Sequence, residues 1–111
     1  MVDLSFLEKF TKGNISKMRR YISLYLEMAP ETFKRMQQNV EDQSWSELAV
    51  NAHSLKPQAD LMGITSLKDV LIEIEKKVES AQLNVLENLF EQAQSIHKES
   101  ETYLQDFVEN S

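Results

Sequence analysis

The residues that decide how this chain folds are Ala52-His53-Ser54-Leu55-Lys56-Pro57-Gln58-Ala59-Asp60-Leu61-Met62-Gly63. Apolar residues recur through and before this stretch at alternating steps of three and four, which predicts a helix with one face in a core. They are Trp45, Leu48, Ala52, Leu55, Ala59 and Met62. His53 follows one position after this stripe, so we expect it at the boundary between core and solvent, with Lys56 and Asp60 along the same edge. A partner could reach a histidine in that place.

The composition favours an all-α protein. The 111 residues contain only two glycines and two prolines, beside many leucines, glutamates, glutamines and lysines. This leaves little turn chemistry for a sheet. A chain of this length can bury one compact core, so we expect a single domain over residues 1–111.

Apolar residues also keep helical phase in four other segments. We expect a helix at about residues 3–10 with Leu4, Leu7 and Phe10 on one side, and others at about 15–40 and 83–109. A further helix is expected between a cap at Thr65 or Ser66 and a break at 80–82. Pro30 lies inside the helix at 15–40 and predicts a bend there, or two helices nearly in line. Short polar connections favour an antiparallel up-down four-helix bundle, with the short N-terminal helix as a lid.

Several residues are typical of helix ends. Gly13 and Gly63 are expected to end the helices before them, and Asn14 to cap the helix that follows. Ser44 and Glu47 are spaced as a capping box for the His53 helix. Thr65 or Ser66 is expected to cap the next helix.

Charge and cysteine content exclude several classes of function. Lysine and arginine number 12 against 18 aspartates and glutamates, which gives a net charge of −6 and disfavours nucleic acid and anionic membranes as partners. There is no cysteine, no apolar run approaching the roughly 18 residues of a membrane span, and no N-terminal targeting signal. We therefore expect a cytoplasmic protein that does not contact a membrane.

The possible chemistry centres on His53. Its helix carries no second histidine or acid at metal-ligand spacing, and neither glycine belongs to a phosphate-binding loop. One helix cannot assemble a hydrolytic triad with its oxyanion hole. The remaining reaction is nucleophilic attack by neutral imidazole on a group that another protein delivers, with Lys56 supplying positive charge to a phosphoryl group.

The stretch Ala52-His53-Ser54-Leu55-Lys56, with Gly63 ten residues after the histidine, resembles the signature of histidine-containing phosphotransfer (HPt) domains of multistep two-component signalling. The upstream pattern is also similar to that family's layout: Met18, Tyr25-Leu26, Pro30, Met36, Trp45 and Leu48. The resemblance implies a phosphorelay intermediate in which His53 accepts a phosphoryl group from a receiver-domain aspartate and passes it to another receiver. It also implies that Lys56 lies beside the phosphate.

The resemblance further implies a polar residue on the next helix that orients the imidazole. By spacing this residue is Glu75, with Gln58 as the alternative. A carboxylate that accepts a hydrogen bond from Nδ1–H would leave Nε2 free to attack. Gly63 is expected to act in packing rather than chemistry. His97 lies in phase with apolar neighbours and is expected to be a histidine at the edge of the core.

We expect the docking surface for a receiver around His53, at Ala49, Val50, Pro57 and Asp60. Pro57 departs from the family pattern, which has a glycine there that lets the receiver approach closely. The resemblance implies a phosphoryl carrier without kinase or hydrolase activity and without a cofactor, because the Mg²⁺ would belong to the receiver. We expect a monomer.

Two alternatives stay open. The chain could be a helical protein interaction module whose histidine takes part in no chemistry, and binding that survives His53→Ala would favour it. It could also be an enzyme that uses His53 as a general base, which turnover without a receiver domain would favour.

Overall fold

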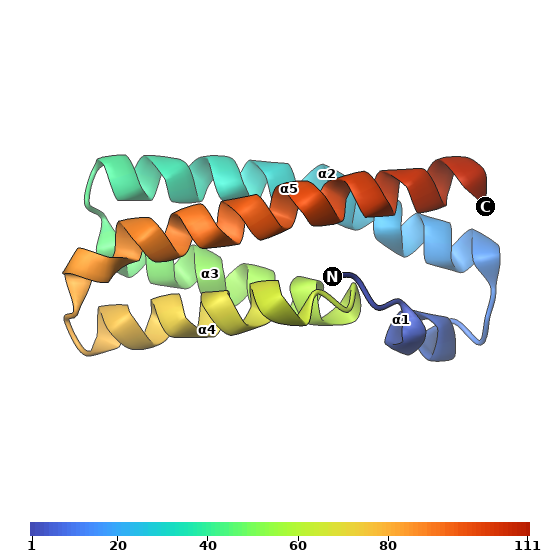
Figure 1. Cartoon of the computed structure of the whole chain (residues 1–111), viewed down its shortest axis with the longest axis horizontal. Helices are drawn as coiled ribbons and strands as arrows, with labels where there is room; N and C mark the ends of the chain where they lie inside the picture. The colour runs from blue at the N-terminus through green and yellow to red at the C-terminus, as the bar shows by residue number, and fades with distance from the viewer.

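The computed structural model describes all residues from 1 to 111 and contains helices but no strand (Figure 1). The helices are α1 (Ser5–Phe10), α2 (Ile15–Glu41), α3 (Trp45–Leu61), α4 (Thr65–Glu79), the short 3₁₀ helix η1 (Leu83–Val85) and α5 (Leu86–Asn110). The predicted segments therefore agree with the structure to within a few residues.

The four long helices form an antiparallel up-down bundle, as predicted. Helix α2 packs against α3, α3 against α4, α4 against α5, and α5 back against α2, so the four helices close a ring. Figure 1 shows them running along the long axis of the molecule, with α1 at one end beside the start of α2. Principal dimensions of 43 × 20 × 18 Å reflect this elongated shape.

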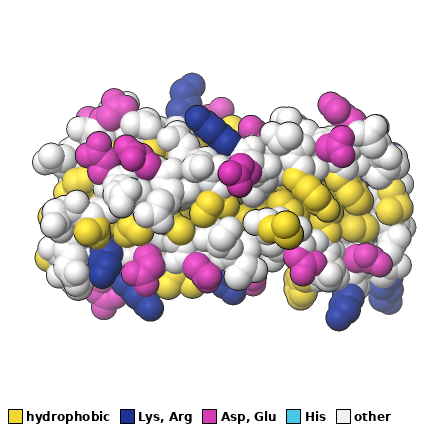
Figure 2. Space-filling model, in the orientation of Figure 1, with side chains coloured by type: hydrophobic (Ala, Val, Ile, Leu, Met, Phe, Trp, Pro, Cys, Tyr) yellow, Lys and Arg dark blue, Asp and Glu magenta, His cyan; other side chains and the backbone are white.

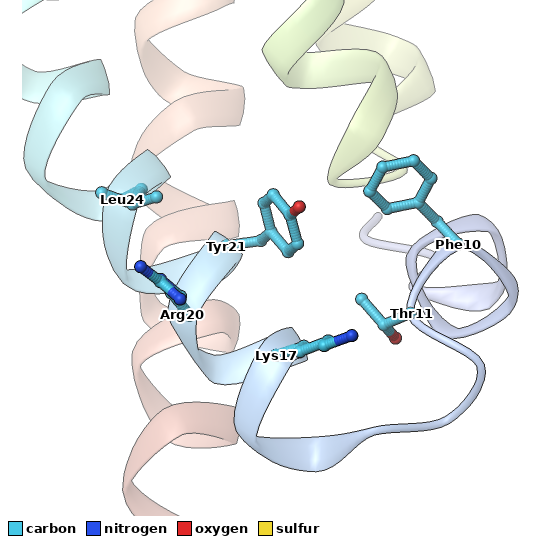
Figure 3. Close-up of a pocket in the computed structure, with 6 residues that line it drawn as sticks. All are labelled: Phe10, Thr11, Lys17, Arg20, Tyr21 and Leu24. Atoms are coloured by element: carbon cyan, nitrogen blue, oxygen red, sulfur yellow. The ribbon is translucent and has the colours of Figure 1, made fainter.

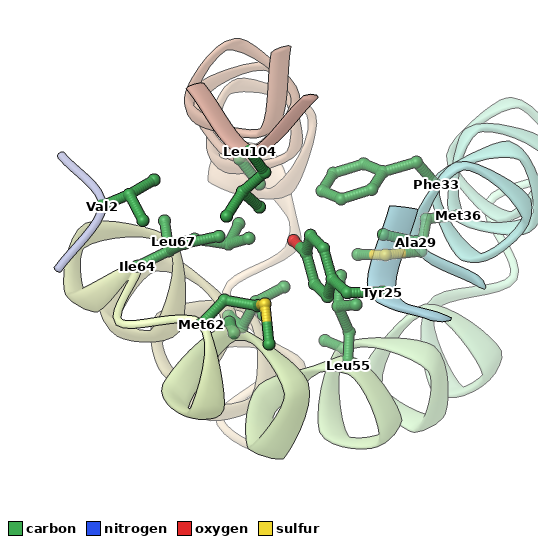
Figure 4. Close-up of a cluster of buried hydrophobic side chains, with 14 of the residues drawn as sticks. Val2, Tyr25, Ala29, Phe33, Met36, Leu55, Met62, Ile64, Leu67 and Leu104 are labelled. Atoms are coloured by element: carbon green, nitrogen blue, oxygen red, sulfur yellow. The ribbon is translucent and has the colours of Figure 1, made fainter. Parts of the chain in front are cut away.

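The core comprises 21 buried apolar residues from the N-terminal segment and the helices α1 to α5. Figure 4 shows side chains of the four long helices meeting in the centre, with Val2 beside Ile64 and Leu67. Each fully buried leucine or isoleucine contributes roughly 1.5–3 kcal/mol relative to an exposed one. The apolar stripes read from the sequence therefore face one another in the bundle.

The short helix α1 differs in part from the prediction. Its Leu7 is fully buried, but Phe10, which was expected on the same apolar side, is 56% exposed. Phe6 is exposed as well. Six residues make less than two helical turns, so one leucine is enough to anchor α1, and the two phenylalanines face solvent.

The predicted helix caps are right at one of three places. Asn14 caps α2, with its Oδ1 accepting a hydrogen bond from the Lys17 N–H at 3.0 Å. Ser44 precedes α3, but its side chain makes no capping hydrogen bond, and the expected capping box is wrong. The cap of α4 is Ile64 rather than Thr65 or Ser66. Ile64 is fully buried, so core packing determines where α4 begins.

Both prolines lie inside continuous helices. Helix α2 runs through Pro30 and α3 runs through Pro57. A proline removes one helical hydrogen bond, at a cost of about 3 kcal/mol. Buried residues flank Pro30 (Ala29 and Thr32) and Pro57 (Leu55 and Ala59), and their packing holds each helix on both sides of its proline.

Gly63 makes the turn between α3 and α4 and also touches the N-terminal segment. Its φ of +68° lies in the left-handed region, which glycine adopts without steric cost. Its carbonyl oxygen accepts a hydrogen bond from the Asp3 N–H at 3.0 Å. This contact fixes the chain that precedes α1 against the bundle.

Candidate functional site

His53 stands on the outer surface of α3. The buried residues of this helix are Leu48, Ala52, Leu55 and Ala59, and His53 lies off their stripe. Its side chain is 70% exposed. The face of the molecule in Figure 2 shows acidic, basic and apolar side chains but no histidine. The imidazole is thus open to a large partner.

Glu75 reaches the histidine from the neighbouring helix α4. Its Oε2 lies 3.1 Å from His53 Nδ1, and its Oε1 lies 2.9 Å from Lys56 Nζ. Helices α3 and α4 form the closest-packed pair of the bundle, and this brings together residues 22 positions apart in the sequence. The structure therefore places His53, Lys56 and Glu75 in one cluster.

The charges in this cluster favour an ionised glutamate. Partial burial by itself raises the pKa of the Glu75 carboxyl, but hydrogen bonds from Lys56 and His53 and their positive charges outweigh it and hold the pKa below its usual value. An ionised Glu75 can only accept hydrogen bonds. When the His53 imidazole is neutral, Nδ1 then carries its proton and Nε2 carries the lone pair.

The arrangement is suited to nucleophilic attack. Nε2 carries the free lone pair on an exposed ring, Glu75 restricts rotation of that ring, and the Lys56 ammonium lies nearby. A phosphoryl group in transfer needs positioning and compensating positive charge more than it needs covalent help. The cluster offers both of these.

The other predicted residues surround this cluster without joining it. Gln58 is half-buried and its side chain makes no hydrogen bond, whereas Glu75 contacts the His53 ring. Val50 and Pro57 are exposed on either side of His53, and Val50 is 67% exposed. Ala49 is half-buried. Asp60 is exposed and forms an ion pair with Lys68 at 3.1 Å.

His97 belongs to α5, is far more buried than His53, and packs against α2. Its ring stacks on Phe33 with centroids 4.3 Å apart and meets the Tyr25 ring edge-on at 6.4 Å. The nearest carboxylate oxygen, on Glu101, is 3.6 Å from Nε2, which is too long for a good hydrogen bond. His97 is therefore a core residue.

We predict that His97 makes folding stability depend on pH. Burial lowers its pKa below the ordinary value of 6.5, although the negative charge of Glu101 acts in the opposite direction. The unfolded chain then binds the proton more tightly, so this contribution to stability is complete above about pH 6.5 and is lost as the pH falls towards the folded-state pKa. The free energy of unfolding, measured in urea between pH 5 and 7.5, should fall more steeply with decreasing pH for wild type than for His97→Phe. Equal slopes would contradict the prediction.

The structure also shows an exposed apolar surface that the sequence reading did not identify. A pocket of about 430 Å³ lies between α1 and the start of α2. Figure 3 shows Phe10 and Tyr21 facing each other across it, with Lys17 and Arg20 from α2 at its edge. The two rings meet edge-on at 5.6 Å, and Phe6 stacks on Phe10 at 6.2 Å. The signal in the sequence was the pair Phe6 and Phe10, which are four residues apart and therefore share one face of α1.

The structure shows neither a metal-binding group of side chains nor a membrane-spanning helix. No group of three or more histidines, aspartates and glutamates is arranged to hold a metal ion. None of the helices is long and apolar enough to cross a membrane.

Comparison with known proteins gives one match. The family model described as Hpt domain matches residues 20–110, which include α3, α4 and the whole His53 cluster. Searches of curated proteins and of solved structures gave no match. Because the family model covers most of the chain, the chain belongs to the Hpt domain family, whose members carry phosphoryl groups in two-component signalling together with receiver domains.

Proposed function

We propose that this chain is a phosphorelay intermediate that accepts a phosphoryl group on His53 from a receiver-domain aspartate and passes it to a second receiver. The observation that carries the proposal is the hydrogen bond between His53 Nδ1 and Glu75 at 3.1 Å, in a histidine whose side chain is 70% exposed. Family membership supports phosphotransfer in general.

In the proposed step, the lone pair of His53 Nε2 attacks the phosphorus of an aspartyl phosphate. The N–P bond forms as the bond between phosphorus and the aspartate oxygen breaks, and the aspartate leaves as a carboxylate. The imidazole becomes positively charged and keeps its Nδ1 proton, which it donates to Glu75. Lys56 lies close enough to exchange its contact with Glu75 for one with the phosphoryl oxygens. Transfer onward is the reverse reaction.

We propose that Mg²⁺ is supplied by the receiver and that the chain has no cofactor and no kinase or hydrolase activity of its own. The receiver would dock on the outer side of α3 at Val50 and Pro57, with Ala49 and Asp60 at the edge. We add the surface of Phe6 and Phe10 to this docking region, because Phe6 lines a pocket together with Asp60 and exposed aromatic residues are typical of interfaces. The absence of an N–H on Pro57 leaves the His53 carbonyl without its helical partner, so a receiver can donate a hydrogen bond to it.

The proposal is tested by incubating the chain with a panel of receiver domains charged by a small phosphodonor. We expect at least one receiver to label the chain, with a label that acid removes and alkali does not. Adding an uncharged second receiver should then remove the label. If no receiver labels the chain while the same receivers label a known HPt domain, the phosphotransfer role is wrong and the interaction module becomes the better reading.

We predict that Glu75→Gln slows labelling about 5- to 10-fold without abolishing it. The glutamine amide oxygen can still accept a hydrogen bond from Nδ1–H, but a hydrogen bond to a charged acceptor is stronger than one to a neutral acceptor by about 1–1.5 kcal/mol, and this difference sets the expected rate change. Initial rates at saturating receiver measure the effect. Glu73→Gln on the same helix is the matched control, because Glu73 lies outside the cluster and has only a long contact of 4.0 Å with Lys76. Equal rates for the two variants would refute an orienting role for Glu75.

A further inference from the structure

A groove of about 340 Å³ runs between α2 and α3 on the side of α3 away from Glu75. Arg35 lines it, with Nε 3.4 Å from Asn51 Oδ1 and Nη2 3.2 Å from Thr32 Oγ1. Asn51 in turn donates to Asn39 Oδ1 at 2.7 Å. These side chains form a continuous network that holds an exposed guanidinium in place.

The support for Arg35 is buried, although its guanidinium is exposed. Thr32 is 1% exposed and Asn39 is 8% exposed, in an interface that otherwise consists mainly of apolar residues. Burying polar groups costs free energy unless each one is hydrogen-bonded, and here the network satisfies them. Apolar side chains could fill the positions of Thr32 and Asn39 without any hydrogen bonds. The network therefore indicates that the surface above it, which carries Arg35, has a function.

The charge of Arg35 is not balanced within the chain. No carboxylate lies within ion-pair distance of its guanidinium. Glu47 is the acidic residue in the groove, and its Oε2 lies 3.5 Å from Asn39 Nδ2. With two contacts already fixing its orientation, Arg35 still has free N–H groups that can bind a carboxylate in a bidentate manner.

The groove that Arg35 lines reaches the His53 side of α3 through Val50. Val50 is exposed, lines the groove and precedes His53 by three residues, which is about one helical turn, whereas Asn51 faces Arg35 on α2. A domain that covers His53 and rests on Val50 therefore reaches the groove.

We propose that Arg35 is a specificity-determining residue that binds an aspartate or glutamate side chain on the surface of the docked receiver domain. This inference rests on the proposed function and adds a contact on α2 to the surface on α3. Val50 provides the apolar contact beside that ion pair, and the network through Thr32 and Asn51 holds Arg35 ready before the receiver binds.

The test measures phosphoryl transfer from a charged receiver to the full chain as a function of receiver concentration. For Arg35→Glu we expect the second-order rate at low receiver concentration to fall by about 10-fold or more, and the rate at saturating receiver to stay within twofold of wild type. High salt should reduce the difference in second-order rate between wild type and Arg35→Glu, because salt screens charges at an exposed interface. Binding of the uncharged receiver to a chain carrying His53→Gln together with Arg35→Glu should weaken in parallel.

Lys34→Glu is the matched control, since it makes the same change of charge at the adjacent position, where the side chain lines a pocket beside α5. Its transfer rates should match wild type. Equal effects of the two variants, or no effect of either, would overturn this inference while leaving the proposed function intact. A fall only in the saturated rate would also overturn it, because Arg35 would then act on the reacting group. Failure of every receiver to label the wild-type chain would overturn both.

Discussion

Replacing His53 with glutamine is expected to abolish phosphoryl transfer to this chain. Glutamine has no nucleophilic nitrogen, and loss of the attacking group should lower the rate by at least on the order of 10³-fold. The side chain of His53 is 70% exposed, so the substitution should leave folding unchanged. Labelling from a receiver that phosphorylates wild type measures the effect, with urea unfolding to verify the fold.

His97→Gln is the control for this experiment, because it removes the other histidine of the chain. It should keep its label even though it loses stability, since His97 is buried between Phe33 and Tyr25 in the core. A label that persists in His53→Gln and disappears in His97→Gln would show that the phosphoryl group is carried elsewhere than on His53.

Replacing Gly63 with alanine is expected to give a large loss of stability. The φ of +68° puts an alanine in the left-handed region, at a cost of about 1–2 kcal/mol. Its Cβ would also lie 1.6 Å from the Asp3 carbonyl oxygen, so the N-terminal segment has to move. This breaks the hydrogen bond from Asp3 to Gly63, which contributes about 0.5–1.5 kcal/mol. We expect these two terms together to lower the free energy of unfolding in urea by about 1.5–3.5 kcal/mol.

The variant Gly13→Ala separates the cost of the backbone conformation from the cost of the contact with Asp3. Gly13 has nearly the same backbone conformation, with φ +73°, but no atom lies within 4 Å of the added Cβ. We expect it to lose only the conformational part, about 1–2 kcal/mol. If Gly63→Ala loses no more than Gly13→Ala, the contact with Asp3 does not contribute to stability.

The helices and the positions of His53 and Lys56 could be predicted because their signals are local. The step of three and four in Leu48, Ala52 and Leu55 defines a buried face, and the same geometry puts His53 off that face. Lys56 follows from its spacing of three residues after the histidine. Glu75 was inferred from a resemblance to the HPt family, and the structure brings it within 3.1 Å of the ring, while its role in transfer stays a prediction.

Features that depend on contacts between residues far apart in the sequence could not be predicted from such local signals. The start of α4 was misplaced because burial of Ile64 decides it, and local hydroxyl groups do not. Phe10 was assigned to the buried side of α1, but so short a helix covers too little of the bundle to bury it.

The sequence by itself determined an all-α chain, the order of its helices and an accessible histidine with a lysine one turn away, because helical periodicity and spacing act over a few residues. Only the tertiary structure decided which groups meet across helices. Arg35 and Asn51 are 16 positions apart, and Asp3 and Gly63 are brought together by packing of the N-terminal segment on the bundle. Such contacts depend on how the helices rotate and slide to fill one common core, and no single stretch of sequence records that choice.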